Sequence, residues 1–102
     1  MAQDRTQRPF VEELPRLLEA RRMSVRSVEK ALGLSHGFLS RVLRQRDYKT
    51  PSPDLTRRVA QALDLAPDFF PEAREGFIFE RVRADAKLRD RLYDELRGAR
   101  RR

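Results

Sequence analysis

The chain has 102 residues, of which 39% are hydrophobic and 38% charged, and its formal net charge is +7. This length suits one small domain rather than a roomy enzyme cleft, and the absence of cysteine excludes disulfides and thiolate zinc sites. No apolar stretch reaches the roughly 18 residues that span a bilayer, and the N-terminus does not resemble a signal peptide, so we expect a cytoplasmic protein and no membrane partner.

The first predicted helix leads up to residue 23 and is constrained by Pro15. Proline is tolerated in a first turn, so the regular helix is expected to begin near Glu12 or Glu13, or to be kinked there. Its inward face is formed by Leu14, Leu17 and Leu18. Arg21 and Arg22 either cap the negative end of this helix or contact phosphate groups, and the sequence leaves both interpretations open.

Residues 24–44, SVRSVEKALGLSHGFLSRVLR, predict two short helices joined by a tight turn. Ser24 is expected to cap the first helix, Gly33 to end it in a left-handed conformation, and Ser35 to cap the second. Apolar residues gather on one side of each helix: Val25, Val28, Ala31 and Leu32 on the first, and Phe38, Leu39, Val42 and Leu43 on the second. The opposite arc of the second helix carries His36, Gly37, Ser40, Arg41 and Arg44. An apolar arc thus faces inward and an arc rich in hydrogen-bond donors faces outward.

Residues 45–50 show no periodicity and are predicted to form a loop. Ser52 and Pro53 then predict the cap and first residue of a fourth helix. The core stripe of that helix is predicted to consist of Leu55, Val59, Ala62 and Leu63. Pro67 is expected to open a short helix whose Phe69 and Phe70 close the bottom of a helical bundle.

About 30 residues follow Pro71 and carry too much apolar surface for a free tail. A helix is predicted over residues 72–83, although GFIFERV could form a short strand, and Asp85 is expected to cap a last helix. These helices either pack back on their own domain or form a dimer interface. The residues predicted for such an interface are Phe77, Ile78, Leu88, Leu92 and Leu96, with Tyr93 at the edge.

The positive charge is concentrated in two segments. Residues 21–50 carry +6 (eight basic and two acidic residues), residues 51–96 carry −2, and residues 97–102 carry +4. A polyanionic partner would explain this distribution, because Lys and Arg on phosphates release counterions. A solvated basic surface is the alternative, since 20 of the 23 basic residues are arginine.

Residues 14–70 resemble the lambda repressor and Cro type (XRE) family of helix-turn-helix DNA-binding domains. The resemblance is carried by Val28, Leu32, Gly33, Leu34, Leu39 and Val42, and by the flanking segments LPRLLEARRMS and SPDLTRRVAQALDLAPDFF. Glu29 departs from it, because the family usually has a small residue there. Either the two helices lie further apart at this point, or the carboxylate pairs with an arginine.

The resemblance implies an all-α fold with a five-helix lambda-repressor-like bundle, to which the helices predicted after Pro71 add a two-helix C-terminal extension. The domains expected are a mobile N-terminal arm over residues 1–9, a DNA-binding domain over 10–70, a helical extension over 71–97 and a basic tail over 98–102.

The resemblance also implies that the helix from about His36 to Arg44 lies in the major groove of DNA. The residues expected to contact bases are His36, Gly37, Ser40 and Arg41. Those expected to contact phosphates are Ser24, Arg26, Lys30, Ser35, Arg44, Arg46, Tyr48 and Lys49.

The function expected is therefore that of a sequence-specific transcriptional regulator, a repressor that binds an inverted-repeat operator on double-stranded DNA as a homodimer. The alternative is an antitoxin or other interaction module whose C-terminal helices bind a partner protein, such as a toxin. With one histidine and no Gly-rich phosphate loop, the sequence predicts no catalytic residues, metal site or cofactor.

Overall fold

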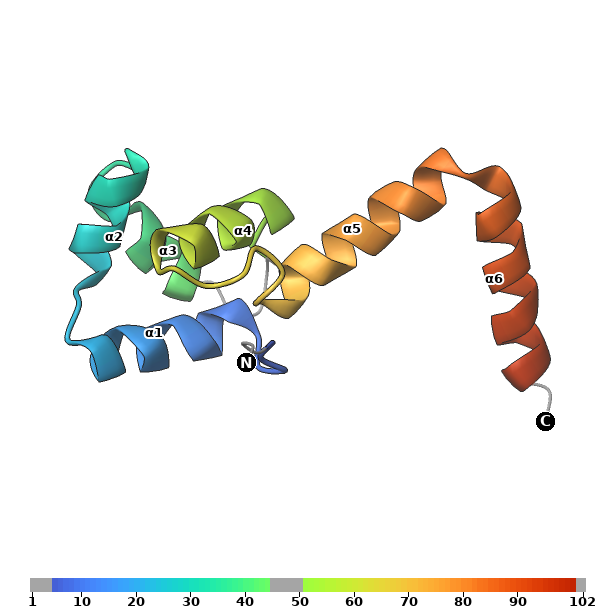
Figure 1. Cartoon of the computed structure of the whole chain (residues 1–102), viewed down its shortest axis with the longest axis horizontal. Coiled ribbons are helices and arrows are strands. Elements are labelled where there is room, and N and C mark those ends of the chain that lie inside the picture. Colours follow the sequence, from blue (N-terminus) through green and yellow to red (C-terminus); the bar gives the residue numbers. More distant parts are fainter. Residues whose placement is uncertain (1–4, 45–50, 101–102) are drawn as a thin grey trace.

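The structure, a computed structural model, describes residues 5–44 and 51–100, and these ranges contain six helices and no strand (Figure 1). The helices are α1 (Phe10–Arg21), α2 (Val25–Leu32), α3 (Phe38–Arg44), α4 (Pro53–Ala62), α5 (Pro71–Ala84) and α6 (Ala86–Arg100). The all-α prediction is confirmed, and the ambiguous GFIFERV segment lies within α5. None of these helices is both long enough and apolar enough to cross a membrane.

Helix α1 begins at Phe10, earlier than predicted, and continues through Pro15. Its start is fixed by a distant residue, because both carboxylate oxygens of Glu72 accept hydrogen bonds from the backbone N–H of Phe10, at 3.2 and 3.1 Å. At the other end, Arg22 adopts a left-handed conformation and the guanidinium of Arg21 donates to the carbonyl of Leu63. Arg21 therefore ties α1 to the end of α4.

The core lies between α1, α2, α3 and α4 and is closed by two phenylalanines. The ring of Phe70 packs edge-on against Phe10 and Phe69, with centroids 4.9 and 5.0 Å apart. Phe69 and Phe70 are buried as predicted. The segment that starts at Pro67, however, is a turn and not a short helix. Among the described residues, the other large side chains that are fully buried are Leu14, Val28, Leu39, Val59, Thr56 and Leu63, together with Glu29.

The buried face of α4 differs from the predicted stripe at one position. Leu55, Val59 and Leu63 are buried, whereas Ala62 is exposed. Thr56 and Ala60 are buried in its place. Thr56 can be buried because its hydroxyl donates to the carbonyl of Pro53, at 2.9 Å, which satisfies its hydrogen-bonding capacity within the helix.

Residues 5–9 are held against the bundle, although an arm over residues 1–9 was predicted to be mobile. The N–H of Thr6 donates to the carbonyl of Phe69 at 3.0 Å, and its own carbonyl accepts from Arg74 at 2.9 Å. Arg5 forms a salt bridge with Asp68 at 3.2 Å. Residues 1–4 lie outside the described ranges.

Helix α5 starts inside the bundle and then leaves it. Glu72, Ala73 and Gly76 are buried, and a Cβ at Gly76 would collide with the ring of Pro53, so α4 and α5 approach closely there. The predicted boundary at residue 71 therefore falls within packed structure. Beyond Gly76 the helix projects away, and α6 turns off from its end (Figure 1).

The turn between α5 and α6 is capped as predicted. The carboxylate of Asp85 accepts a hydrogen bond from the N–H of Leu88 at 3.1 Å. The predicted basic tail over residues 98–102 begins within a helix, because α6 continues to Arg100.

Candidate nucleic-acid interface

The start of α2 has the predicted cap. Ser24 is extended, and its hydroxyl oxygen accepts a hydrogen bond from the N–H of Ser27 at 3.0 Å. The hydroxyl of Ser27 donates in turn to the carbonyl of Ser24 at 2.7 Å. These two bonds fix the first turn of α2 by local interactions alone.

The end of α2 also follows the prediction. Gly33 has a left-handed backbone with φ of 71°, and the N–H of Leu34 donates to the carbonyl of Glu29 at 2.8 Å. This arrangement satisfies carbonyls that would otherwise be left unbonded at a helix end. The chain thereby reverses direction within a few residues and brings α3 across α2.

The start of α3 is capped differently from the prediction, which assigned the cap to Ser35 and began the helix near His36. The helix begins at Phe38, and the carboxylate of Glu29 on α2 accepts hydrogen bonds from two N–H groups at its start. Oε1 of Glu29 lies 3.2 Å from the nitrogen of Gly37, and Oε2 lies 2.8 Å from that of Leu39. One side chain therefore joins the two helices and replaces the local cap.

The Glu29 side chain is only 1% exposed, yet its charge is well compensated. Burial raises the pKa of this carboxyl, but hydrogen bonds from the N–H groups of Leu39 and Gly37 and from Arg26 outweigh burial and lower the pKa below 4.5. Nη1 of Arg26 lies 3.1 Å from Oε1, which confirms the alternative that the carboxylate pairs with an arginine. Negative charge at the N-terminal end of α3 also suits the helix dipole.

The predicted base-contacting residues lie together around the first turn of α3. His36 and Arg41 are exposed, while Gly37 and Ser40 are half-buried. Gly37 has φ of 89°, and a Cβ there would lie 3.3 Å from Nη1 of Arg41. The guanidinium of Arg41 therefore lies over the backbone of Gly37, at the exposed end of the helix. The apolar side of α3 faces the core, where Leu39 is fully buried and Val42 and Leu43 are partly buried.

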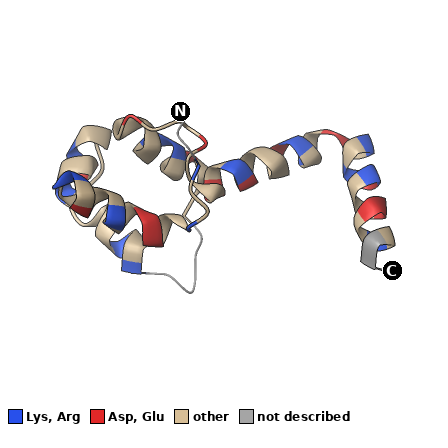
Figure 2. Cartoon of the chain, turned by 60° about the horizontal axis from the view of Figure 1, so that its bottom comes forward, with Lys and Arg blue, Asp and Glu red and all other residues tan. Residues whose placement is uncertain are grey.

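The predicted phosphate-contacting residues differ in their exposure and in the contacts they already make. Lys30, Ser35 and Arg44 are exposed, and Ser24 is exposed but uses its hydroxyl as a cap. Arg26 is half-buried and paired with Glu29. The remaining three, Arg46, Tyr48 and Lys49, lie outside the described residues. Figure 2 shows Lys and Arg together with Asp and Glu on the helices of the bundle and on α5 and α6 alike.

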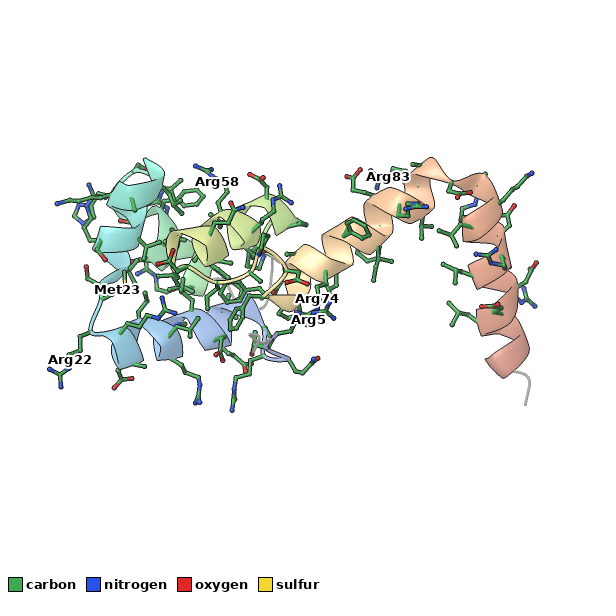
Figure 3. All side chains as sticks on the ribbon, viewed as in Figure 1. Arg5, Arg22, Met23, Arg58, Arg74 and Arg83 are labelled. Carbon is green, nitrogen blue, oxygen red and sulfur yellow. The ribbon has the colours of Figure 1, made fainter. Side chains whose placement is uncertain are left out.

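One arginine in this region was not singled out from the sequence. Arg58 on α4 donates through Nη2 to the carbonyl of Leu32 at 3.1 Å, at the end of α2 (Figure 3). It stabilises the last turn of α2 and supports the loop before α3. No signal in the sequence distinguishes it from its neighbour Arg57, because the contact depends on how α4 crosses α2.

The residues predicted for a dimer interface lie on α5 and α6, away from the α2–α3 pair. Phe77, Ile78 and Leu96 are exposed, and Leu88 and Leu92 are half-buried. Tyr93 is exposed and accepts a hydrogen bond from Arg97 at 3.0 Å. Helix α6 does not pack back on the bundle (Figure 1), so the alternative in which both helices return to their own domain is wrong for α6.

Comparisons with protein-family models, with curated proteins and with solved structures found no match. The functional interpretation of the α2–α3 pair therefore rests on the chemistry and geometry of this chain.

Proposed function

We propose that this protein is a sequence-specific regulator of transcription that binds double-stranded DNA through a helix-turn-helix of the lambda repressor and Cro type and acts as a repressor. The observation that carries the proposal is the fixed start of α3. The buried carboxylate of Glu29 holds this helix on α2, while His36 and Arg41 beside it remain exposed. A short helix presented in this way suits the major groove, which admits an α-helix end-first against base edges.

In the proposed complex, the first turn of α3 contacts bases. Arg41 is the residue assigned to guanine, because its planar fork matches O6 and N7 of that base. Gly37 lacks a side chain and so allows close approach, and Ser40 and His36 supply further hydrogen-bonding groups. Arg41 must leave its position over Gly37 to reach a base, and an exposed arginine can make this rotamer change easily.

Phosphate contacts are assigned to cations on α2 and α3 and in the segment that follows α3 in the sequence. Lys30 on α2 and Arg44 at the end of α3 are exposed, and Arg46 and Lys49 belong to the segment that follows α3. Arg26 is assigned mainly to holding Glu29, because the two side chains already form an ion pair. Contacts of this kind position the protein on DNA and set affinity without specifying sequence.

The operator is proposed to be an inverted repeat bound by a homodimer. A single recognition helix reads few base pairs, and two such helices spaced about one DNA turn, roughly 34 Å, read two half-sites. The exposed apolar residues of α5 and α6 are available to hold two chains together. The same surface would equally serve a different protein partner, as in the antitoxin alternative.

Selection from random duplex DNA at fixed salt, with the full-length protein, tests the proposal. We expect enrichment of an inverted repeat whose half-sites are centred about 10 base pairs apart. The same selection with Arg41→Ala should lose preference at one position of each half-site. Binding that never discriminates between sequences, and falls uniformly as salt rises, would show a non-specific basic surface instead.

A further inference from the structure

The middle of α5 carries three exposed apolar side chains in a row. Phe77, Ile78 and Phe79 are consecutive, so their side chains point about 100° apart around the helix, and they are 70%, 54% and 64% exposed. Exposed apolar side chains gathered in one place mark an interaction surface. Together they span roughly 200° around the helix, so a partner has to contact α5 on more than one side.

A groove runs along α5 where it leaves the bundle. Its volume is about 1010 Å³, and it is bounded by the start of α4, the turn at residues 67–68 and α5 itself. Phe77 and Ile78 line it, and Arg5 and Arg57 stand on its wall. The charges on this wall are already satisfied, because Arg5 pairs with Asp68 and Arg57 with Asp54. The groove thus presents a mostly apolar surface to its occupant.

Figure 3 shows Arg5 and Arg74 close together near the start of α5 and Arg83 near its outer end, and all three residues line the groove. Arg74 donates to the carbonyls of Thr6, Asp68 and Phe69, which joins the N-terminal segment, the turn and α5. The inner end of the groove is therefore rigidly built within one chain, although nothing from that chain fills it.

Helix α6 has the dimensions and the surface to fill such a groove. Its 15 residues span about 22 Å, and Leu88, Leu92 and Leu96 form one stripe at four-residue spacing. Glu95 flanks this stripe by helical spacing, and Arg83, of opposite charge, lies on the lining of the groove. Within its own chain α6 is carried away from the groove by the turn at Asp85 (Figure 1).

The size of the molecule indicates how much surface is left uncovered. The radius of gyration is 16.3 Å, against about 13 Å for a compact chain of this length. The accessible surface is 7639 Å², against about 6000 Å² for a folded monomer of this mass. The arm beyond Gly76 accounts for part of this excess, and a standard interface takes roughly 800 Å² from each partner. A second copy of this chain can supply the apolar stripe of its α6 to this groove, and its own groove to the stripe of the first copy.

We propose that two copies exchange their C-terminal arms, so that α6 of each chain lies in the α4–α5 groove of the other. The two α5 helices then cross near Phe77–Phe79, and each is enclosed by the partner's α6 and by its own bundle. Such a contact is isologous, because the same stripe and groove are used twice about a two-fold axis. The exchange rests on the homodimer of the proposed function and specifies how its two chains associate. It involves no contact with DNA.

Cysteine cross-linking of the full-length chain tests the exchange. The sequence has no cysteine, so only the introduced cysteines can form disulfides. Arg57→Cys on the groove wall is combined in turn with Leu88→Cys, Leu92→Cys and Leu96→Cys along the stripe. Under oxidation, at least one double variant should form a disulfide-linked dimer of twice the chain mass, while each single variant stays mostly uncross-linked.

Three other results would overturn the proposal. Efficient cross-linking of Leu92→Cys alone would indicate direct pairing of two α6 helices without exchange. A disulfide within one chain, at the mass of the monomer, would indicate that α6 folds back in solution. Absence of cross-links from all three double variants would show that the groove is not the site of α6.

Sedimentation without DNA supplies an independent measurement. Leu96→Lys changes an exposed stripe residue, so the monomer should keep its helical content, and dimerisation should weaken about tenfold or more because a buried Leu contributes about 1.5–3 kcal/mol. Asp90→Lys, on the opposite side of α6, is the matched control and should remain dimeric. A wild-type chain that is monomeric at micromolar concentration overturns the exchange even if the DNA selection succeeds, so the two proposals fail separately.

Discussion

At the scale of single residues, Glu29 has the largest structural role in the candidate interface. An isolated buried charge is costly, but this carboxylate receives hydrogen bonds from two backbone N–H groups and from Arg26. It thereby fixes both the position of α3 and the end from which His36 and Arg41 project. A residue that looked like a departure from the family pattern is therefore the link between the two helices.

Glu29→Gln tests this role. The amide keeps the shape of the side chain but points N–H groups at donors, so we expect a lower Tm at pH 7 than for wild type. Glu19→Gln, an exposed change on α1, is the control and should leave Tm nearly unchanged. Equal Tm values for the two variants would show that the hydrogen bonds to Gly37 and Leu39 do not contribute to stability.

The same variant tests how the stability contributed by Glu29 depends on pH. Because the folded-state pKa of Glu29 is lowered below 4.5, its stabilisation is fully present above that pH and is lost as the pH falls through the folded-state pKa. The difference in unfolding free energy between wild type and Glu29→Gln should therefore shrink as the pH is lowered from about 4.5. Urea unfolding of both proteins at a series of pH values from 7 downward measures this difference in unfolding free energy. A difference that grows on acidification would contradict the lowered pKa.

Arg41 is the second residue whose role can be separated from general electrostatics. Arg41→Ala should weaken binding to the selected operator by about 1–3 kcal/mol and relax specificity at one base pair of the half-site. Arg44→Ala, one helical turn further along α3, should weaken binding to all sequences alike. Titrations of both variants on the operator and its point substitutions distinguish them, and a uniform loss for Arg41→Ala would make it a phosphate contact.

At the scale of elements, some helices are capped by residues next to them in the sequence and others by distant residues. The caps of α2, α4 and α6 could be predicted because Ser24, Ser52 and Asp85 bind N–H groups three residues away. The starts of α1 and α3 could not, because their caps are Glu72, 62 residues from Phe10, and Glu29, on a different helix from Leu39. The predicted helix at Pro67 failed similarly, since the guanidinium of Arg74 and the N–H of Thr6 donate to carbonyls of that turn, at Asp68 and Phe69.

The turn before α3 gives a prediction at this scale. Gly37 is left-handed, so Gly37→Ala should lower the unfolding free energy by about 1–2 kcal/mol and also displace Arg41. Gly98→Ala is the matched control: it lies in α6 with no atom near its added methyl group, and alanine there should favour the helix. Denaturant unfolding of both variants compares them. Equal stability of Gly37→Ala and wild type would show that the turn can adopt another conformation.

At the scale of the whole molecule, the chain divides into a closed bundle and an open arm. The bundle ends at Gly76, the last residue of α5 that is buried, and the arm beyond it has little apolar contact of its own. The sequence could predict the amphipathic stripe of α6 and the excess of apolar residues after Pro71. It could not predict that α6 would be held away from the bundle, because that depends on the angle at which α5 leaves α4.

Deleting residues 84–102 tests this division. The deletion keeps every buried residue of α5, so circular dichroism should show a folded domain with fewer helical residues. By sedimentation the shortened chain should be monomeric, whereas the full-length chain should be a dimer. In gel-shift titrations on an inverted repeat, the monomer should bind roughly 100-fold more weakly, because the second half-site no longer gains from tethering. A truncated chain that still dimerises would place the interface elsewhere, and one that unfolds would make α6 part of the folding unit.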